Sequence, residues 1–251
     1  MKVRLLTTGF KSAYENMAID EAVLIHAQKN RQATLRFYGW KPFAISIGYF
    51  QSLKEEVDIH ECKKQKIDYI RRITGGGAVF HQSEVTYSLV APIDDKFIPR
   101  DIQKSYQKIC QGIITGLKIL GIESQFVPLN DIVAYGKKIS GNAQTRKNNI
   151  LLQHGTVLLD VDVEKMFNLL KVSQEKIKDK LIKDVRQRVV GIRELLGKQV
   201  KFPFCQEALI HGFEKALKLE YSKTPLTVSE LALASELKEH KYNLPKWNYL
   251  R

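Results

Sequence analysis

The stretch RRITGGGAVFH, residues 71–81, combines two arginines, three consecutive glycines and a strand-like Ala-Val-Phe segment. Glycine has no Cβ, so its backbone amides can approach a ligand closely, and a neighbouring guanidinium group can form two hydrogen bonds to one carboxylate or phosphate. A tight turn between two strands is the alternative interpretation, but such a turn normally needs only one or two glycines. The stretch therefore predicts an anion-binding site. It is not a P-loop or a dinucleotide fingerprint, because no Gly-Lys-Ser/Thr and no G-x-G-x-x-G spacing is present.

Length and composition predict a single domain over residues 1–251, since this length can bury a large core without disulfides. Three scattered cysteines form no C-x-x-C pair, which argues against a disulfide framework or a thiolate metal site. The N-terminus reaches polar residues too soon for a signal peptide, and the longest apolar runs are strand-sized, so we expect a cytoplasmic protein with no membrane span. The net charge of +13 predicts an acidic partner.

Helical and strand periodicity alternate along the chain, which predicts an α/β (α+β) fold. The capping box Ser12-x-x-Glu15 opens a helix to about residue 29, and apolar residues spaced by three and four predict a helix over 102–120 that Gly121 ends. Segments 33–38 and 44–49 are interpreted as a hairpin, and 55–66 as one charged helix. Further strands are expected at 68–72, 79–80, 86–91, 124–127, 131–134, 138–139 and 150–159. Beyond about residue 163 the chain is helix-rich, with helices expected near 163–171, 174–183, 206–219 and 228–240, the last opened by the capping box Thr227-x-x-Glu230.

A second polar cluster joins Asn130 and Asp131 to the run GKKISGNAQ, residues 136–144. A lysine between a carboxylate and a phosphoryl group can neutralise charge as they approach, and an aspartate that faces phosphates usually does so through Mg²⁺. Lys138, beside an apolar isoleucine and small residues, is the functional candidate. Lys137 is interpreted as a solvated turn lysine, and His154 as a structural histidine between strand residues.

These motifs together resemble the lipoate-protein ligase A family, and the resemblance covers nearly the whole chain. The matching segments are LRFY (35–38), GYFQ (48–51), the 71–81 stretch, Asn130-Asp131 with KISGNA (138–143), HGT (154–156), Arg186-x-Arg188-Val189 and KWNY (246–249). The family shares its fold with biotin protein ligases, which implies a mixed sheet flanked by helices. The biotin branch itself is disfavoured, because its Gly-Arg-Gly-Arg-x-Gly loop is missing.

The resemblance implies a ligase in which lipoate attacks the α-phosphorus of ATP, pyrophosphate leaves with Mg²⁺, and a lysine of a lipoyl domain then displaces AMP. It implies no tightly bound prosthetic group, and positioning and charge neutralisation carry the catalysis. Lys138 is the implied catalytic residue, bridging the acyl carboxylate and the α-phosphate. The implied acyl-adenylate site comprises Arg71, Gly75, Gly76, Gly77, His81, Gly141 and Ala143. The implied nucleotide contacts are Val79, Phe80, Asn130 and Asp131, with Asp131 also the Mg²⁺ contact.

The implied partners are acidic lipoyl-domain proteins, namely E2 subunits and the H protein of glycine cleavage. The chain resembles the short, bipartite ligases, which need a separate accessory subunit to activate lipoate. Octanoyl transfer from a carrier protein is the alternative activity, because three stretches also resemble the cysteine-dependent octanoyltransferases, namely RFYGW (36–40), AQTR (143–146) and LQHG (152–155). Those enzymes hold a cysteine in the loop that matches residues 123–129, where this chain has none. A nucleic-acid-binding protein is the least favoured alternative, since no helix-turn-helix pattern is present.

Overall fold

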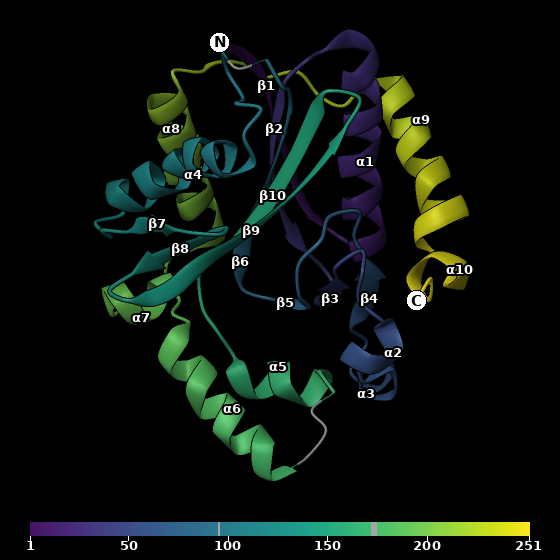
Figure 1. Ribbon diagram of the computed structural model, residues 1–251, viewed down its shortest axis with the longest axis vertical. Helices are drawn as coiled ribbons and strands as arrows, with labels where there is room; N and C mark the ends of the chain where they lie inside the picture. Colours follow the sequence, from purple (N-terminus) through teal and green to yellow (C-terminus); the bar gives the residue numbers. More distant parts are fainter. Residues whose placement is uncertain (95, 172–174) are drawn as a thin grey trace.

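Two β-sheets organise the chain in the computed structural model, which describes residues 1–94, 96–171 and 175–251, with only the backbone described for 175–181 (Figure 1). The large sheet has the order β11-β1-β2-β6-β10-β9-β8-β7, and the small sheet has the order β4-β3-β5. β1 pairs in parallel with β2 and β11. The neighbours in the rest of the large sheet, β2-β6-β10-β9-β8-β7, all pair antiparallel, so the sheet is mixed. The strands are β1 Lys2–Lys11, β2 Thr34–Trp40, β3 Ala44–Ile47, β4 Asp68–Arg71, β5 Val79–His81, β6 Glu84–Pro92, β7 Gln125–Val127, β8 Asp131–Ala134, β9 Lys137–Lys147, β10 Ile150–Leu158 and β11 Glu220–Ser222.

Helices cover both faces of the large sheet. On one face, α4 and α8 pack through residues such as Ile113 and Phe213 against Phe37 of β2. On the other face, α1 packs against Tyr38 of β2 and Leu152 of β10, and α9 lies outside α1 (Figure 1). The helices are α1 Ala13–Asn30, α2 Leu53–Glu56, α3 Ile59–Lys64, α4 Ile102–Ile119, α5 Val163–Leu169, α6 Glu175–Arg188, α7 Ile192–Leu196, α8 Phe202–Leu217, α9 Val228–Leu237, the π-helical turn Lys238–Tyr242 and α10 Pro245–Asn248.

The expected α/β class, with a mixed sheet flanked by helices, is confirmed. Both capping boxes form, because the Ser12 and Thr227 hydroxyls accept bonds from the Glu15 and Glu230 amides. The expected hairpin is wrong: β2 joins the large sheet through β1 and β6, whereas β3 joins the small sheet through β4 and β5. The expected helix over 55–66 is two short helices, α2 and α3. Residue 174, where one helix was expected to begin, lies outside the described residues.

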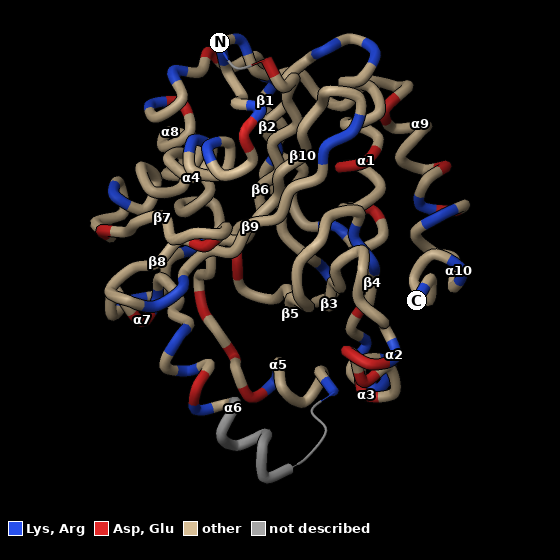
Figure 2. Tube along the Cα trace, in the orientation of Figure 1, with Lys and Arg blue, Asp and Glu red and all other residues tan. Residues whose placement is uncertain are grey.

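In Figure 2, lysines and arginines are spread along the tube and are interspersed with aspartates and glutamates. Among the described residues, no helix is long and apolar enough to cross a membrane.

The contact between α4 and α8 depends on glycine, which gives a stability prediction. A Cβ on Gly112 would lie 2.4 Å from the ring of Phe213, which is fully buried. We expect Gly112→Ala to lower the free energy of unfolding by about 1–3 kcal/mol, because overpacking a core forces side chains or backbone to shift. Urea denaturation checks this, with the exposed Gln111→Ala as control on the same helix. An unchanged unfolding midpoint for Gly112→Ala would show that the contact between α4 and α8 can shift to accommodate a methyl group at little cost.

Candidate active site

A cavity of about 360 Å³ lies where the large sheet, the small sheet and the α5–α6 segment meet. Its walls come from β2, β3, β5 and β6 on one side and from β9 and β10 on another, and a third wall is made by Asp160, Val161, Asp162, Met166, Val185 and Val189. Most of the lining is apolar, with Met17, Trp40, Phe80 and Met166 among the contributors. This size and composition are typical of a small-molecule site.

Lys138 and Asp131 form an ion pair at this cavity. They lie on the adjacent antiparallel strands β9 and β8, and the Lys138 Nζ is 2.7 Å from the Asp131 Oδ1. Both side chains are only partly exposed, at 41% and 33%. No aligned hydrogen bond reaches Asp131 Oδ1 within the described residues, so the contact is electrostatic and can rearrange when a charged ligand enters. The two residues of the second polar cluster therefore lie side by side on adjacent strands.

Gly141 leaves room for the lysine. A Cβ at Gly141 would lie 2.9 Å from both the Cε and the Nζ of Lys138, which is closer than real contacts allow. We expect Gly141→Ala to reduce the rate of the acyl transfer that the sequence predicts by about 10- to 100-fold, since a displacement of about 1 Å in an active site can cost that much. The measurement is the initial rate of acceptor modification, with Thr145→Ala on the same strand as control. A normal rate in Gly141→Ala would mean that the position of Lys138 is not critical.

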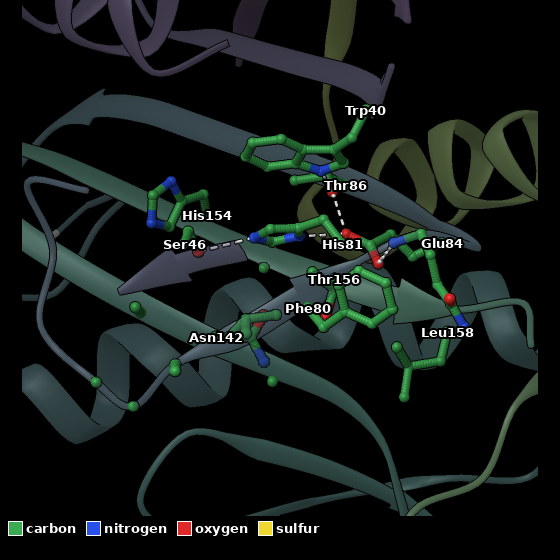
Figure 3. A pocket seen from close by; sticks show the side chains of 18 of the residues that line it. Trp40, Ser46, Phe80, His81, Glu84, Thr86, Asn142, His154, Thr156 and Leu158 are labelled. Carbon is green, nitrogen blue, oxygen red and sulfur yellow. Dashed lines mark hydrogen bonds and ion pairs between the residues drawn. The ribbon is translucent and has the colours of Figure 1, made fainter. Parts of the chain in front are cut away.

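His81 is buried and held on both ring nitrogens (Figure 3). Its Nδ1 bonds Oε1 of Glu84, and its Nε2 lies 2.8 Å from the Ser46 hydroxyl. The indole of Trp40 stacks on the imidazole, with ring centroids 3.9 Å apart and planes 15° from parallel. Trp40 is itself fixed, because its Nε1 donates to the Thr86 hydroxyl at 2.8 Å. The imidazole therefore has one orientation.

A second buried network joins α1 to the glycine stretch. Asp20 accepts hydrogen bonds from Arg36 and Ser88 on Oδ1 and from Tyr38 on Oδ2, at 2.7–2.9 Å, and His154 Nδ1 lies 3.4 Å from the same Oδ2. Burial alone would raise the pKa of Asp20, but the Arg36 charge and the bonds from His154 and Ser88 hold that pKa below its ordinary value. Asp20 is therefore a carboxylate.

His154 completes this second network. Burial lowers its pKa, which keeps the imidazole neutral near pH 7. Its Nε2 lies 2.7 Å from the hydroxyl of Thr74, the residue before the glycines. His154 lines the cavity, and its contacts fit the structural role that the sequence indicates.

The two arginines of the 71–81 stretch have different environments. Arg71 does not line the cavity; its guanidinium donates to the carbonyls of residues 48, 49, 51, 247 and 248, which ties the C-terminal segment to the loop after β3. Arg72 lines the cavity and donates to the carbonyls of Gly75 and Gly77 at 2.8 Å. Burial lowers the pKa of Arg72 to about 10, so the group remains charged near pH 7. Arg72, not Arg71, shapes the glycine loop.

The structure brings most of the predicted site residues to the cavity. Those that line it are Lys138, Gly76, Gly77, His81, Gly141, Ala143, Val79, Phe80 and Asn130. Asp131 contacts Lys138 without lining the cavity, and Gly75 lies next to the lining glycines. Residues missed from the sequence are Trp40, Ser46, Arg72, Glu84, Thr86 and Asn142. The His81-x-x-Glu84 spacing was a usable signal, whereas Ser46 gave none inside an apolar strand.

The three cysteines, all within the described part of the chain, lie away from the cavity lining. Each is buried, and burial raises the pKa of each thiol to about 12. A thiol with such a pKa is a poor nucleophile near neutral pH.

The carboxylate of Asp131 suits an ion that arrives with a nucleotide. Among the described residues, no group of three or more histidines, cysteines or acidic residues could hold a metal by itself. Mg²⁺ is usually held by one or two carboxylates together with substrate phosphates and water. Asp131 offers one such carboxylate beside the cavity, and its Oδ1 has no aligned hydrogen bond. These residues fit magnesium as part of a Mg-ATP substrate.

Sequence comparison identifies full-length relatives. The model of the lipoyl protein ligase A/B catalytic domain matches residues 12–214. The octanoyltransferase LipM of Geobacillus kaustophilus is 36% identical, over 99% of this chain and 98% of the relative. LipM of Bacillus subtilis is 33% identical with the same coverage. These names agree better with the predicted alternative, octanoyl transfer, than with the ligase interpretation.

Solved structures include ligases of the same fold. A bi-partite lipoate protein ligase of Thermoplasma acidophilum, studied with its E2 lipoyl domain, superposes with a TM-score of 0.91 at 33% identity, covering 99% of this chain and 96% of that one. A lipoate-protein ligase A bound with ATP gives 0.85 at 31% identity, covering 99% of both chains. The predicted family is confirmed, and the chain belongs to the lipoyl protein ligase A/B catalytic-domain family of enzymes.

Proposed function

We propose that the protein transfers a medium-chain acyl group, lipoyl or octanoyl, from an activated donor to a lysine of a lipoyl domain. The observation that carries this proposal is the Lys138–Asp131 ion pair beside an apolar cavity lined by glycines. The apolar walls suit an acyl chain, and the Lys138 ammonium can stabilise negative charge that develops on the donor during transfer.

The donor that best suits the site is an acyl-adenylate made from lipoate and Mg-ATP. An adenylate needs no enzyme nucleophile, and this cavity has no cysteine in its lining. Lys138 would neutralise the acyl carboxylate and the α-phosphate as they approach, and Asp131 would contact the magnesium that accompanies the phosphates. Gly76 and Gly77, with Val79, Phe80 and Asn130, would surround the adenylate, and Ala143 and His81 the acyl end. Support comes from the structural neighbour bound with ATP.

Octanoyl transfer from a carrier protein, without ATP, is the second candidate. The LipM name of the full-length relatives favours it. It requires that the acyl group leave a thioester, either directly to the acceptor lysine or through a nucleophile of the enzyme.

The acceptor in either case is a lipoyl domain, such as that of an E2 subunit or of the glycine-cleavage H protein. The Thermoplasma acidophilum neighbour was studied with its E2 lipoyl domain, which supports a partner of this kind. The net charge of +13 suits an acidic domain. An accessory activating subunit remains part of the ligase proposal.

Intact-mass spectrometry of an apo lipoyl domain distinguishes the candidates. Separate reactions supply lipoate with Mg-ATP, pre-formed lipoyl-AMP, or an octanoylated carrier protein. A lipoyl adduct from Mg-ATP supports a self-sufficient ligase, and an adduct from lipoyl-AMP alone supports a transferase that needs a partner for activation. An adduct from the octanoyl carrier alone would replace the ligase proposal by the second candidate. No adduct from any donor would refute both.

A further inference from the structure

Ser46, His81 and Glu84 form a continuous hydrogen-bonded chain, of which the adenylate proposal uses only His81, as a neighbour of the acyl end. The Ser46 Oγ lies 2.8 Å from the His81 Nε2, and the His81 Nδ1 bonds Oε1 of Glu84. All three residues line the cavity, and Figure 3 shows them in this order. A hydroxyl, an imidazole and a carboxylate in this order are the parts of a serine acyl-transfer site.

The neighbouring donors determine how the protons are arranged. Arg72 Nη1 donates to the Ser46 Oγ at 3.1 Å, so the hydroxyl oxygen is an acceptor there and its own proton can point to His81 Nε2. A carboxylate only accepts, so the bond to Glu84 places the proton of the neutral imidazole on Nδ1 and leaves Nε2 unprotonated toward the Ser46 hydroxyl. This is the tautomer in which histidine can remove the serine proton, and the stack with Trp40 holds the ring in that orientation.

The surroundings of Ser46 favour a charged transition state. Arg72 is 5% exposed and places a buried positive charge beside the oxygen that would become nucleophilic. Charge stabilisation of this kind is strongest where water is excluded. Ser46 itself is 1% exposed, so it lies at the inner part of the cavity, where only a group that enters the cavity can reach it.

We propose that Ser46 is an acyl-accepting nucleophile, activated by His81 and Glu84, for medium-chain acyl esters and thioesters. The acyl class rests on the proposed function. In the first step the Ser46 Oγ bonds the acyl carbon, its proton passes to His81 Nε2, and the bond to the leaving alkoxide or thiolate breaks. The leaving group takes that proton from His81. In the second step the acceptor amine or, in its absence, water bonds the acyl carbon of the acyl-serine ester and gives a proton to His81 Nε2. The bond between the acyl carbon and the Ser46 Oγ breaks, and His81 returns that proton to Oγ, which restores the serine hydroxyl. No oxidant, nucleotide or metal is consumed.

Such a nucleophile provides a route for octanoyl transfer in a chain whose cavity holds no cysteine. Glu84 does not touch the donor; it is a positioning residue that selects the histidine tautomer and stabilises the imidazolium.

The first test uses p-nitrophenyl octanoate with no ATP and no lipoyl domain. We expect release of p-nitrophenolate and an octanoyl group on the peptide that contains Ser46 after acid quenching. Ser46→Ala should abolish the adduct, and Glu84→Gln should slow the release by about 10²-fold or more, in the range that general-base catalysis supplies. Ser222→Ala, at an exposed strand edge, is the control. An adduct on Lys138 or on a cysteine, or no adduct with intact binding of the ester, would overturn the proposal.

A second variant tests the proposal independently, in case Ser46→Ala does not fold. Ser46→Cys places a thiol against His81, and we expect iodoacetamide to alkylate it faster than the three native cysteines, with a further slowing in the Glu84→Gln background. Equal, slow alkylation of all four thiols would refute activation by His81. Because neither assay contains ATP or a lipoyl domain, failure here is distinct from failure of the proposed transfer reaction.

Discussion

Replacement of Lys138 by alanine is expected to reduce the rate of acyl transfer to a lipoyl domain by about 10²- to 10³-fold, the range measured when one preorganised group that stabilises transition-state charge is removed. The ammonium lies 2.7 Å from the Asp131 carboxylate and lines the cavity, so it is placed to meet the donor there. Both side chains of the ion pair are partly exposed, at 41% and 33%, so water can hydrate the Asp131 carboxylate that is left behind, and the unfolding midpoint should change little. Initial rates with pre-formed lipoyl-AMP measure the transfer step alone.

Lys137→Ala is the matched control for this experiment. The Lys137 Nζ bonds Glu194 Oε1 at 2.8 Å on the protein surface and takes no part in the cavity lining. Its loss should leave the rate within about twofold, since exposed ion pairs contribute little. Asp131→Asn should produce a smaller defect with lipoyl-AMP than with lipoate and Mg-ATP, because its proposed magnesium contact matters only in activation. A Lys138→Ala rate equal to that of Lys137→Ala would contradict the proposed role of Lys138 in acyl transfer.

Local signals in the sequence were sufficient for several elements. The capping boxes at Ser12 and Thr227 fix where α1 and α9 begin, since side chain and amide lie three residues apart. The apolar spacing over residues 102–120 corresponds to α4, and Gly121, with φ of +84°, follows its end. Each signal lies within a few residues of the structure that it predicts.

Long-range pairing could not be predicted in the same way. Arg71 and Arg72 are adjacent at the end of a strand, where successive side chains point to opposite faces. The sequence does not say which face borders the cavity, and the answer depends on the C-terminal segment, whose Trp247 and Asn248 carbonyls bind Arg71. The role of Ser46 could not be predicted for the same reason, because its partner His81 lies 35 residues later, on β5.

Asp20→Asn is expected to lower the free energy of unfolding by about 3–5 kcal/mol near pH 7, the cost of breaking a buried ion pair by removal of one charge. Asp20 is 2% exposed and Arg36 is 1% exposed, so the guanidinium left behind has no access to water. Tyr38 and Ser88 would also lose a charged acceptor. Ser88→Ala is the graded control: it removes one hydrogen bond and leaves the ion pair, so about 1–3 kcal/mol is expected.

The stabilisation that Asp20 provides depends on pH. Although burial opposes ionisation, Arg36 and the hydrogen bonds from His154 and Ser88 hold the folded-state pKa of Asp20 below the value of about 3.9 expected in the unfolded chain. The stabilisation is therefore complete above about pH 4 and is lost as the pH falls through the lower, folded-state pKa. Urea denaturation near pH 7 should show the full difference between wild type and Asp20→Asn, and the two curves should converge only in more acidic solution. A difference that grows as the pH falls would mean that Asp20 is protonated in the folded protein, and the network around His154 would then need a different assignment of charge.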